Sequence, residues 1–300
     1  MAQLVHTLDL DFQTRHDAIA AYLIPHAEGA MLVESGPGST IDALQARLAE
    51  HKLSVKDITH VLLTHIHLDH AGAAGWLSRQ GAKVVVHPVG APHMIDPTKL
   101  IASATRIYQD KMEILWGDFL AVPEEQVYVP ADGETLEIGG VGVNIHYTPG
   151  HAEHHISYGV DDLVFAGDIG GIRMPNCDYL RLPLVPPELN LEKWQASFEK
   201  LLSFNYKRIA PTHFSIFDDA EKHIQNGMQV IKNTSKWLEE IMPSNPNTEE
   251  LGEKFAAWMM DEGQAAGISI EELQTYEIAN PLHMAAAGLS RYWKKFRASE

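Results

Sequence analysis

The chain has few of the residues on which several protein classes depend. It carries a single cysteine, Cys177, among 300 residues, which excludes an internal disulfide and predicts a reducing compartment. Basic residues number 23 against 40 acidic ones, for a formal net charge of −17. Proteins that bind nucleic-acid backbones or anionic membranes normally present basic patches, so neither partner is expected.

Long hydrophobic runs are also missing. No stretch approaches the roughly 18 consecutive apolar residues of a membrane span. The first residues, M-A-Q-L-V-H-T-L-D-L-D-F, lack a basic region and a sustained apolar core, so no secretory signal is expected. These features and Cys177 together predict a cytoplasmic protein. Apolar residues make up 45% of the chain, enough for a large core in one large domain or two smaller ones.

Histidine, by contrast, is abundant and concentrated. The segment Thr64–Gly72, T-H-I-H-L-D-H-A-G, places His65, His67, Asp69 and His70 within six positions. Imidazole nitrogen and carboxylate oxygen are the usual ligands of Zn²⁺ outside cysteine sites. The preceding run resembles a buried strand and the following one a helix, so these ligands are expected on a strand-to-helix loop.

Three further segments each end an apolar, β-rich run with a ligand-type residue. They are T-P-G-H, F-A-G-D and P-T-H, which supply His151, Asp168 and His213. A histidine-rich surface loop without a metal is the alternative for the first segment taken alone. Four strand ends that all deliver ligand chemistry favour a metal site.

Hydrophobic periodicity predicts alternating strands and helices, then a helical tail. Strands are expected at 19–24, 30–34, 61–63, 82–87, 127–129, 135–138, 141–148 and 207–210. Helices are expected at 39–50, 71–79, 97–115, 191–204, 218–241, 248–262, 269–276 and 281–296. Ser39 is the expected N-cap of the first helix, Thr248 with Leu251 gives a second start signal, and Ser269 with Glu272 matches a capping box. Gly139-Gly140 predicts a hairpin turn. The order predicts two sheets packed face to face with helices outside.

The motif H-x-H-x-D-H, followed in order by His151, Asp168 and His213, resembles the metallo-β-lactamase superfamily, and its wording is closest to the glyoxalase II-like hydrolase branch. The resemblance implies an α/β fold, the αββα sandwich of two mixed sheets with outer helices. Residues 1–217 would form this domain. Residues 218–300 would form a C-terminal helical segment that roofs a substrate cleft or makes the interface of a homodimer.

The resemblance also implies a dinuclear site for two divalent ions, Zn²⁺ first, with iron or manganese as alternatives. One ion would be held by His65, His67 and His151, the other by Asp69, His70 and His213, and Asp168 would bridge them. A hydroxide shared by the two ions would be the nucleophile, and Asp69 would accept its proton. Glu34 and His155 are expected to support the ligands from outside. His60, His87, His93, His146 and His154 are expected in packing or on the surface.

The leading functional hypothesis is hydrolysis of a small thioester, lactone or activated ester. Gly171 stands where the superfamily's quorum-signal lactonases place tyrosine, and no lysine follows Asp168 where glutathione-using glyoxalase II has one. Arg173, Met174 and Tyr179 are candidates for the substrate pocket, with plain packing as their alternative.

Two other functions stay open. One is an iron-dependent oxidoreductase like the persulfide dioxygenases, which metal analysis and oxygen uptake would distinguish. The other is a regulatory or binding module with weak hydrolase activity, against which the complete ligand set argues. Hydrolysis of β-lactams is not expected, because those enzymes are exported.

Overall fold

The computed structural model describes residues 3–298, and its chain forms two compact units. The first runs up to Tyr147 and also takes in His154–Gly167, while the second consists of Thr148–Glu153 and the chain from Asp168 onward. Each unit is described by itself below. The predicted boundary after residue 217 stays a prediction.

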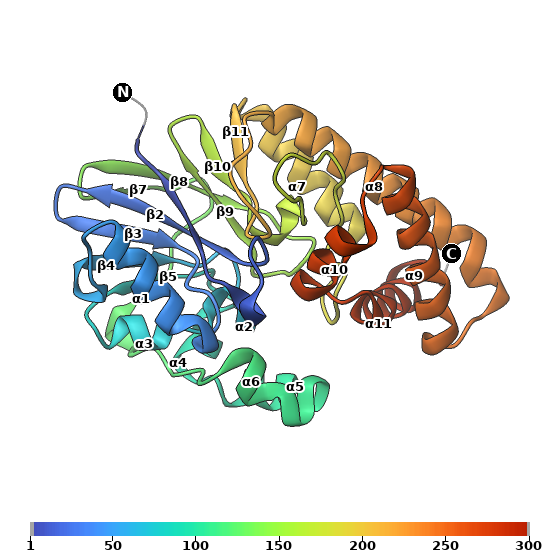
Figure 1. The fold of residues 1–300 in the computed structure, drawn as a ribbon, viewed down its shortest axis with the longest axis horizontal. Coiled ribbons are helices and arrows are strands. Elements are labelled where there is room, and N and C mark those ends of the chain that lie inside the picture. The colour runs from blue at the N-terminus through green and yellow to red at the C-terminus, as the bar shows by residue number, and fades with distance from the viewer. Residues whose placement is uncertain (1–2, 299–300) are drawn as a thin grey trace. The chain divides into compact units, whose positions relative to one another are not determined.

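The first unit contains a mixed sheet with the strand order β1-β2-β3-β4-β5-β6, of which β2 to β5 are labelled in Figure 1. Its strands are β1 (His6–Asp9), β2 (Ala20–His26), β3 (Gly29–Val33), β4 (Ile58–Leu62), β5 (Lys83–Val85) and β6 (Val127–Tyr128). The pairs β1–β2 and β2–β3 are antiparallel, and the pairs from β3 to β6 are parallel. Because β3 and β4 run in parallel, the residues that follow them, Glu34 and Thr64–His70, emerge at the same carboxyl edge, where α/β sheets commonly bind ligands.

A second sheet in this unit is antiparallel in the order β10-β9-β8-β7. Its strands are β7 (Thr135–Ile138), β8 (Val141–Tyr147), β9 (Ile156–Val160) and β10 (Leu163–Phe165). The Gly139-Gly140 turn joins β7 to β8 with both glycines at positive φ, which confirms the predicted hairpin. The two sheets meet face to face, since the ring of Tyr22 lies 5.3 Å from that of Phe165.

Helices of the first unit are short and depart from the predicted boundaries. They are α1 (Ile41–Glu50), α2 (Leu68–Ala71), α3 (Ala74–Ser78), α4 (Ala91–Ile95), α5 (Thr98–Tyr108) and α6 (Met112–Trp116). The expected Ser39 cap is wrong, because the Ser39 hydroxyl donates to the carbonyl of Leu115 instead. The helix expected over 97–115 breaks at Gln109, whose φ is 48°. The expected helix start at residue 71 is also wrong, because α2 already begins at Leu68.

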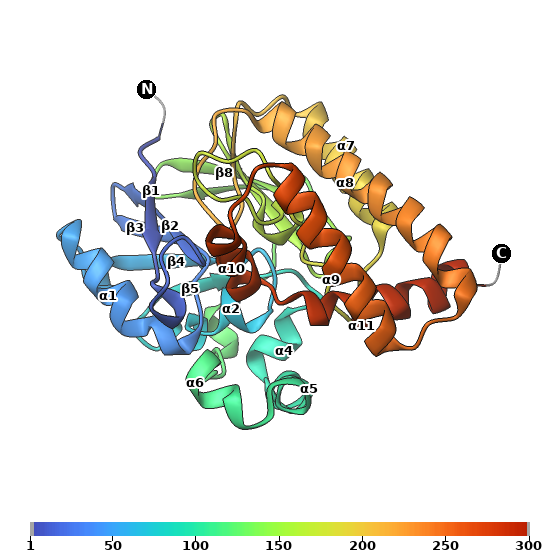
Figure 2. The same cartoon turned by 45° about the vertical axis from the view of Figure 1, so that its right-hand side comes forward.

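The second unit is mainly helical (Figure 2). It holds α7 (Leu191–Ser203), β11 (Arg208–Ala210), α8 (Ala220–Ile241), α9 (Thr248–Ala265), α10 (Ile270–Ala279) and α11 (Leu282–Tyr292). The Ser269–Glu272 capping box is confirmed at α10. At α9 the cap is Asn247, not Thr248, since Asn247 Oδ1 accepts from the N–H groups of Glu249 and Glu250. Within residues 3–298 no helix combines the length and apolar character that a membrane crossing requires.

Candidate metal centre

The loop after β4 points two imidazole nitrogens toward each other. His65 is buried, and its Nδ1 lies 3.0 Å from the Thr64 hydroxyl oxygen. That hydroxyl donates to Glu34, so His65 Nδ1–H is the group that donates to Thr64, which leaves His65 Nε2 with a lone pair. His65 Nε2 lies 2.9 Å from Nδ1 of His67. A pair of imidazole nitrogens at this spacing suits coordination of one cation.

Glu34 anchors a second imidazole of the same loop. This carboxylate is fully buried and accepts hydrogen bonds from the Thr64 N–H at 3.2 Å and from His70 Nδ1 at 2.9 Å. Because His70 donates through Nδ1, its Nε2 carries the lone pair, and it lies 3.4 Å from Asp69 Oδ2. A carboxylate that fixes the tautomer of a ligating histidine is the usual outer support of a metal site.

Asp69 and His70 lie inside α2, not on the loop where they were expected. The expectation holds for His65 and His67, which precede the helix. Two of the predicted ligands therefore lie in the first turn of α2. Ligand-type atoms of Glu34, His65 and His70 lie within 4.8 Å of one another.

Two histidines just before β9 line the same loop. The ring of His155 stacks on that of His65 at a centroid distance of 5.3 Å, and the ring of His154 lies 5.8 Å from that of His67. His154 Nδ1 also accepts from the Ile66 N–H at 3.4 Å. His155 thus lies against the ring of His65, and His154, expected merely to pack, is also a neighbour of the loop Thr64–His70. In the sequence, nothing about the position of His154 after the T-P-G-H motif distinguishes it from a packing histidine.

Gly167 lets the chain pass close to this loop. A Cβ at this position would lie 2.5 Å from Thr64 Oγ1 and 2.6 Å from His155 Nε2, and its φ is 51°. Only glycine fits such a contact without displacing its neighbours.

In the second unit, Asp168 lies between two imidazoles. Its Oδ2 is 3.2 Å from His151 Nε2, and its Oδ1 is 3.3 Å from His213 Nε2. His151 Nδ1–H donates to the Pro183 carbonyl at 2.8 Å, so His151 Nε2 carries the lone pair. All three side chains are at least 95% buried. Each carboxylate oxygen thus faces its own imidazole.

The donor set of each unit fits a borderline metal such as zinc. The described side chains of the loop Thr64–His70 and of the Asp168 group offer imidazole nitrogen and carboxylate oxygen, and hydrogen bonds fix the tautomers of His65, His70 and His151. The neighbouring Tyr108 phenol on α5 was not expected near this chemistry. Burial raises the pKa of Tyr108, and the charge of Asp69 raises it further.

The three candidates for the substrate pocket have different surroundings. Met174 is buried in a cluster with Ile172, Leu273, Tyr276 and Ala279. Tyr179 donates through its hydroxyl to the Met259 carbonyl at 3.2 Å and lines a cavity of about 390 Å³ beside Trp258 and Glu262. The Arg173 side chain is engaged within the second unit, as described below.

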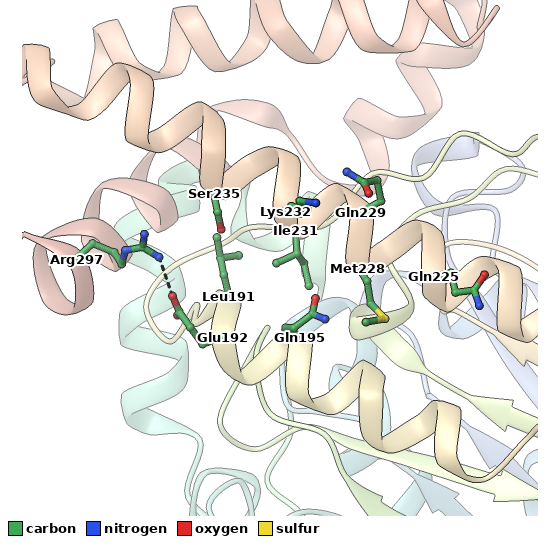
Figure 3. A pocket seen from close by; sticks show the side chains of 10 residues that line it. All are labelled: Leu191, Glu192, Gln195, Gln225, Met228, Gln229, Ile231, Lys232, Ser235 and Arg297. Atoms are coloured by element: carbon green, nitrogen blue, oxygen red, sulfur yellow. Dashed lines mark hydrogen bonds and ion pairs between the residues drawn. The ribbon is translucent and has the colours of Figure 1, made fainter.

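A larger groove of about 630 Å³ runs between α7 and α8 (Figure 3). Its lining includes Gln195, Met228 and Ile231, and Arg297 donates to Glu192 at its end at 3.1 Å. None of the predicted metal ligands lines it.

Comparison with known proteins agrees with this donor chemistry. The profile of the metallo-beta-lactamase superfamily matches residues 15–213. A metallo-beta-lactamase fold-containing protein of Sulfurisphaera tokodaii is 28% identical over 160 residues, which cover 52% of this chain and 60% of that protein. An atrochrysone carboxyl ACP thioesterase of Aspergillus fumigatus is 25% identical over 209 residues, covering 68% of this chain and 53% of the thioesterase.

The fold has counterparts among solved structures. The crystal structure of a metallo-beta-lactamase family protein from Thermus thermophilus matches with a TM-score of 0.70 and 19% identity, covering 97% of this chain and 93% of that one. This similarity confirms the predicted α/β sandwich with its C-terminal helices. At this identity it shows the fold alone.

Proposed function

Because the chain belongs to the metallo-beta-lactamase superfamily, we propose that it is a dinuclear metal-dependent hydrolase. The superfamily includes hydrolases, and its fold typically binds divalent metal ions. In this proposal the two ligand groups described above act together. One ion, Zn²⁺ first, is held by His65, His67 and His151, the other by Asp69, His70 and His213, with Asp168 shared between them.

The observation that carries this proposal is the placement of the Asp168 carboxylate. Its two oxygens approach two different imidazole nitrogens at 3.2 and 3.3 Å. A carboxylate shared by two ions would present one oxygen to each, with a further ligand of each ion beside it, and the placement of Asp168 matches that expectation. The arrangement therefore favours two ions over one.

The chain's own residues prepare the chemistry. When bound, the ions would supply Lewis acidity and a water molecule acidified to a pKa of about 7. Glu34, Thr64 and the Pro183 carbonyl hold protons on the outer nitrogens of His70, His65 and His151, so the inner nitrogens are the ones that would coordinate. The partly exposed Asp69 carboxylate is the candidate to accept a proton from that water and deliver it to a leaving group.

For the substrate we propose a small thioester, lactone or activated ester, as in the glyoxalase II-like branch. The similarity to a thioesterase, although only 25% identical, supports testing thioesters first. A net charge of −17 supports a small-molecule substrate over a nucleic acid or an anionic membrane surface. A cytoplasmic location, and the helices from Ala220 onward as a cleft roof or a homodimer interface, remain predictions.

The test is metal analysis of the purified protein, followed by a screen across thioesters, lactones, β-lactams and phosphodiesters. We expect two zinc ions per chain and hydrolysis of at least one activated acyl compound. Asp168→Ala and His67→Ala should lose metal and hydrolysis together, whereas Asp218→Ala, at an exposed acid, should keep both. One iron per chain with oxygen uptake would favour the persulfide dioxygenase alternative, and full hydrolysis by Asp168→Ala would refute the ligand assignment.

A further inference from the structure

Arg173 is a buried cation with every donor occupied. Its side chain is only 10% exposed, and it lies five residues after Asp168. Its Nε donates to the Cys177 carbonyl at 2.7 Å. Its Nη1 donates to Asp219 Oδ1 at 2.7 Å and meets His223 Nδ1 at 3.3 Å, while Nη2 meets Asp178 Oδ1 at 2.9 Å and Asp219 Oδ2 at 3.0 Å.

These contacts leave no donor for a substrate. A guanidinium has five N–H groups, and the five acceptor contacts of Arg173 match that number. One flat face is also covered, since the Phe217 ring centroid lies 4.1 Å from the guanidinium carbon. The side chain is therefore built into the second unit.

His223 hydrogen-bonds both to Arg173 and to the turn that contains Asp168. His223 Nε2–H donates to the Gly170 carbonyl at 2.7 Å, so Nδ1 is the nitrogen that accepts from Arg173. The neighbouring carbonyl of Ile169 accepts from the Trp194 indole N–H at 3.0 Å. Two side chains from α7 and α8 thus fix consecutive carbonyls of the turn directly after Asp168.

The backbone of Arg173 holds the other ligand of this group. Its N–H donates to the His213 carbonyl at 2.7 Å, and its carbonyl accepts from the Phe214 N–H at 3.2 Å. Ile172 and His213 form a parallel β-bridge. One residue therefore contacts the segment of His213 through its main chain and the segment of Asp168 through His223.

We propose that Arg173, with Asp219 and His223, is a positioning set that holds Asp168 and His213 at the spacing required by the ion they would share. This rests on the proposed function and assigns Arg173 a positioning role in place of the substrate contact expected from the sequence. Asp219 fixes the guanidinium with both carboxylate oxygens, the geometry that arginine satisfies and lysine does not.

The test compares Arg173→Met, Arg173→Lys and Asp219→Asn with Arg297→Met in the full chain. Arg297 is a matched control, because it pairs with Glu192 (Figure 3) and with Glu239, neither of which is a predicted metal ligand. Zinc affinity is measured by chelator competition, and the Co²⁺-loaded protein gives an absorption spectrum that reports the ligand geometry. Outer-support mutations typically lower metal affinity about 10- to 100-fold.

We expect Arg173→Met to lower zinc affinity for one of the two ions by at least about tenfold and to change the Co²⁺ spectrum. Arg173→Lys should bind with intermediate affinity, and Arg297→Met should match the wild type. If Arg173→Met does not fold, Asp219→Asn becomes the test of the positioning role. The Asp219 side chain is 32% exposed and the change is isosteric, so this variant should fold. Wild-type affinity and spectrum in a folded Arg173→Met or Asp219→Asn would overturn the positioning role alone. A wild-type chain that binds no metal would overturn both this inference and the proposed function.

Discussion

His223 should make the stability of the protein depend on pH in a narrow range. Burial lowers the pKa of this imidazole from 6.5 to about 4; its hydrogen bond to Gly170 opposes the shift and the charge of Arg173 adds to it. The side chain is 2% exposed, so solvent screening does not weaken the effect. The perturbation is His223→Gln, since glutamine can still donate to Gly170 and accept from Arg173 but does not titrate.

The sign follows from proton uptake in the two states. Above pH 6.5 neither the folded nor the unfolded chain protonates this group, so it adds no pH dependence. Between pH 6.5 and about 4 the unfolded chain takes up a proton that the folded chain refuses, so the free energy of unfolding falls as the pH falls. At about 1.36 kcal/mol per pKa unit, the loss between about pH 7.5 and pH 5 is about 2 kcal/mol.

The assay is urea unfolding of the metal-free protein in steps from about pH 5 to pH 7.5, for the wild type, His223→Gln and His283→Gln. Other histidines titrate in this range, so the informative quantity is the difference in unfolding free energy between wild type and variant at each pH. That difference should shift by about 2 kcal/mol for His223→Gln, and the exposed His283→Gln variant is the control for loss of a histidine elsewhere in the chain. If plots of unfolding free energy against pH are parallel for the wild type and His223→Gln, the reasoning is refuted.

Three further changes test other parts of the structure. Glu34→Gln replaces the carboxylate that holds His70 and should weaken zinc binding roughly tenfold in chelator competition; unchanged affinity would contradict its supporting role. Gly150→Ala places a Cβ 2.4 Å from Trp194 Cα at a φ of 151°. This change should lower the free energy of unfolding by about 1–3 kcal/mol in urea titrations. If Gly150→Ala is as stable as the wild type, the backbone near Trp194 can move enough to admit the added methyl group. Ser269→Ala removes the N-cap of α10 and should cost about 1 kcal/mol by the same assay, and no loss would mean that tertiary packing alone holds the start of that helix.

The sequence predicts most strands, and the histidine and aspartate motifs that follow several of them, because both depend on local patterns. Short runs of branched residues mark β2, β3 and β4, and the ligand motif follows β4 directly. Strand β1 and strand β9 escape prediction, since H-T-L-D is polar and I-S-Y-G-V contains serine and glycine. The Ser39 cap fails for a tertiary reason: its hydroxyl finds the Leu115 carbonyl 76 residues away.

The supporting contacts of the site could be predicted only in part. Glu34 is suggested by its place after a strand, and the structure gives it His70 and Thr64 as partners. The partners of Arg173 could not be predicted, because Asp219 and His223 are 46 and 50 residues away and no local spacing marks them. Interactions of that range depend on how α8 packs, which periodicity does not specify.

Trp194 gives the protein an internal optical reporter. Its indole N–H donates to the carbonyl of Ile169, the residue after Asp168, and its ring centroid lies 5.7 Å from that of His151. An open-shell ion such as Co²⁺ bound at Asp168 and His151 should quench the fluorescence of this indole, whereas closed-shell Zn²⁺ should leave the fluorescence unquenched. Subtracting the emission of a Trp194→Phe variant removes the signal of the other five tryptophans. Occupancy could then be followed by fluorescence in real time, without any attached dye.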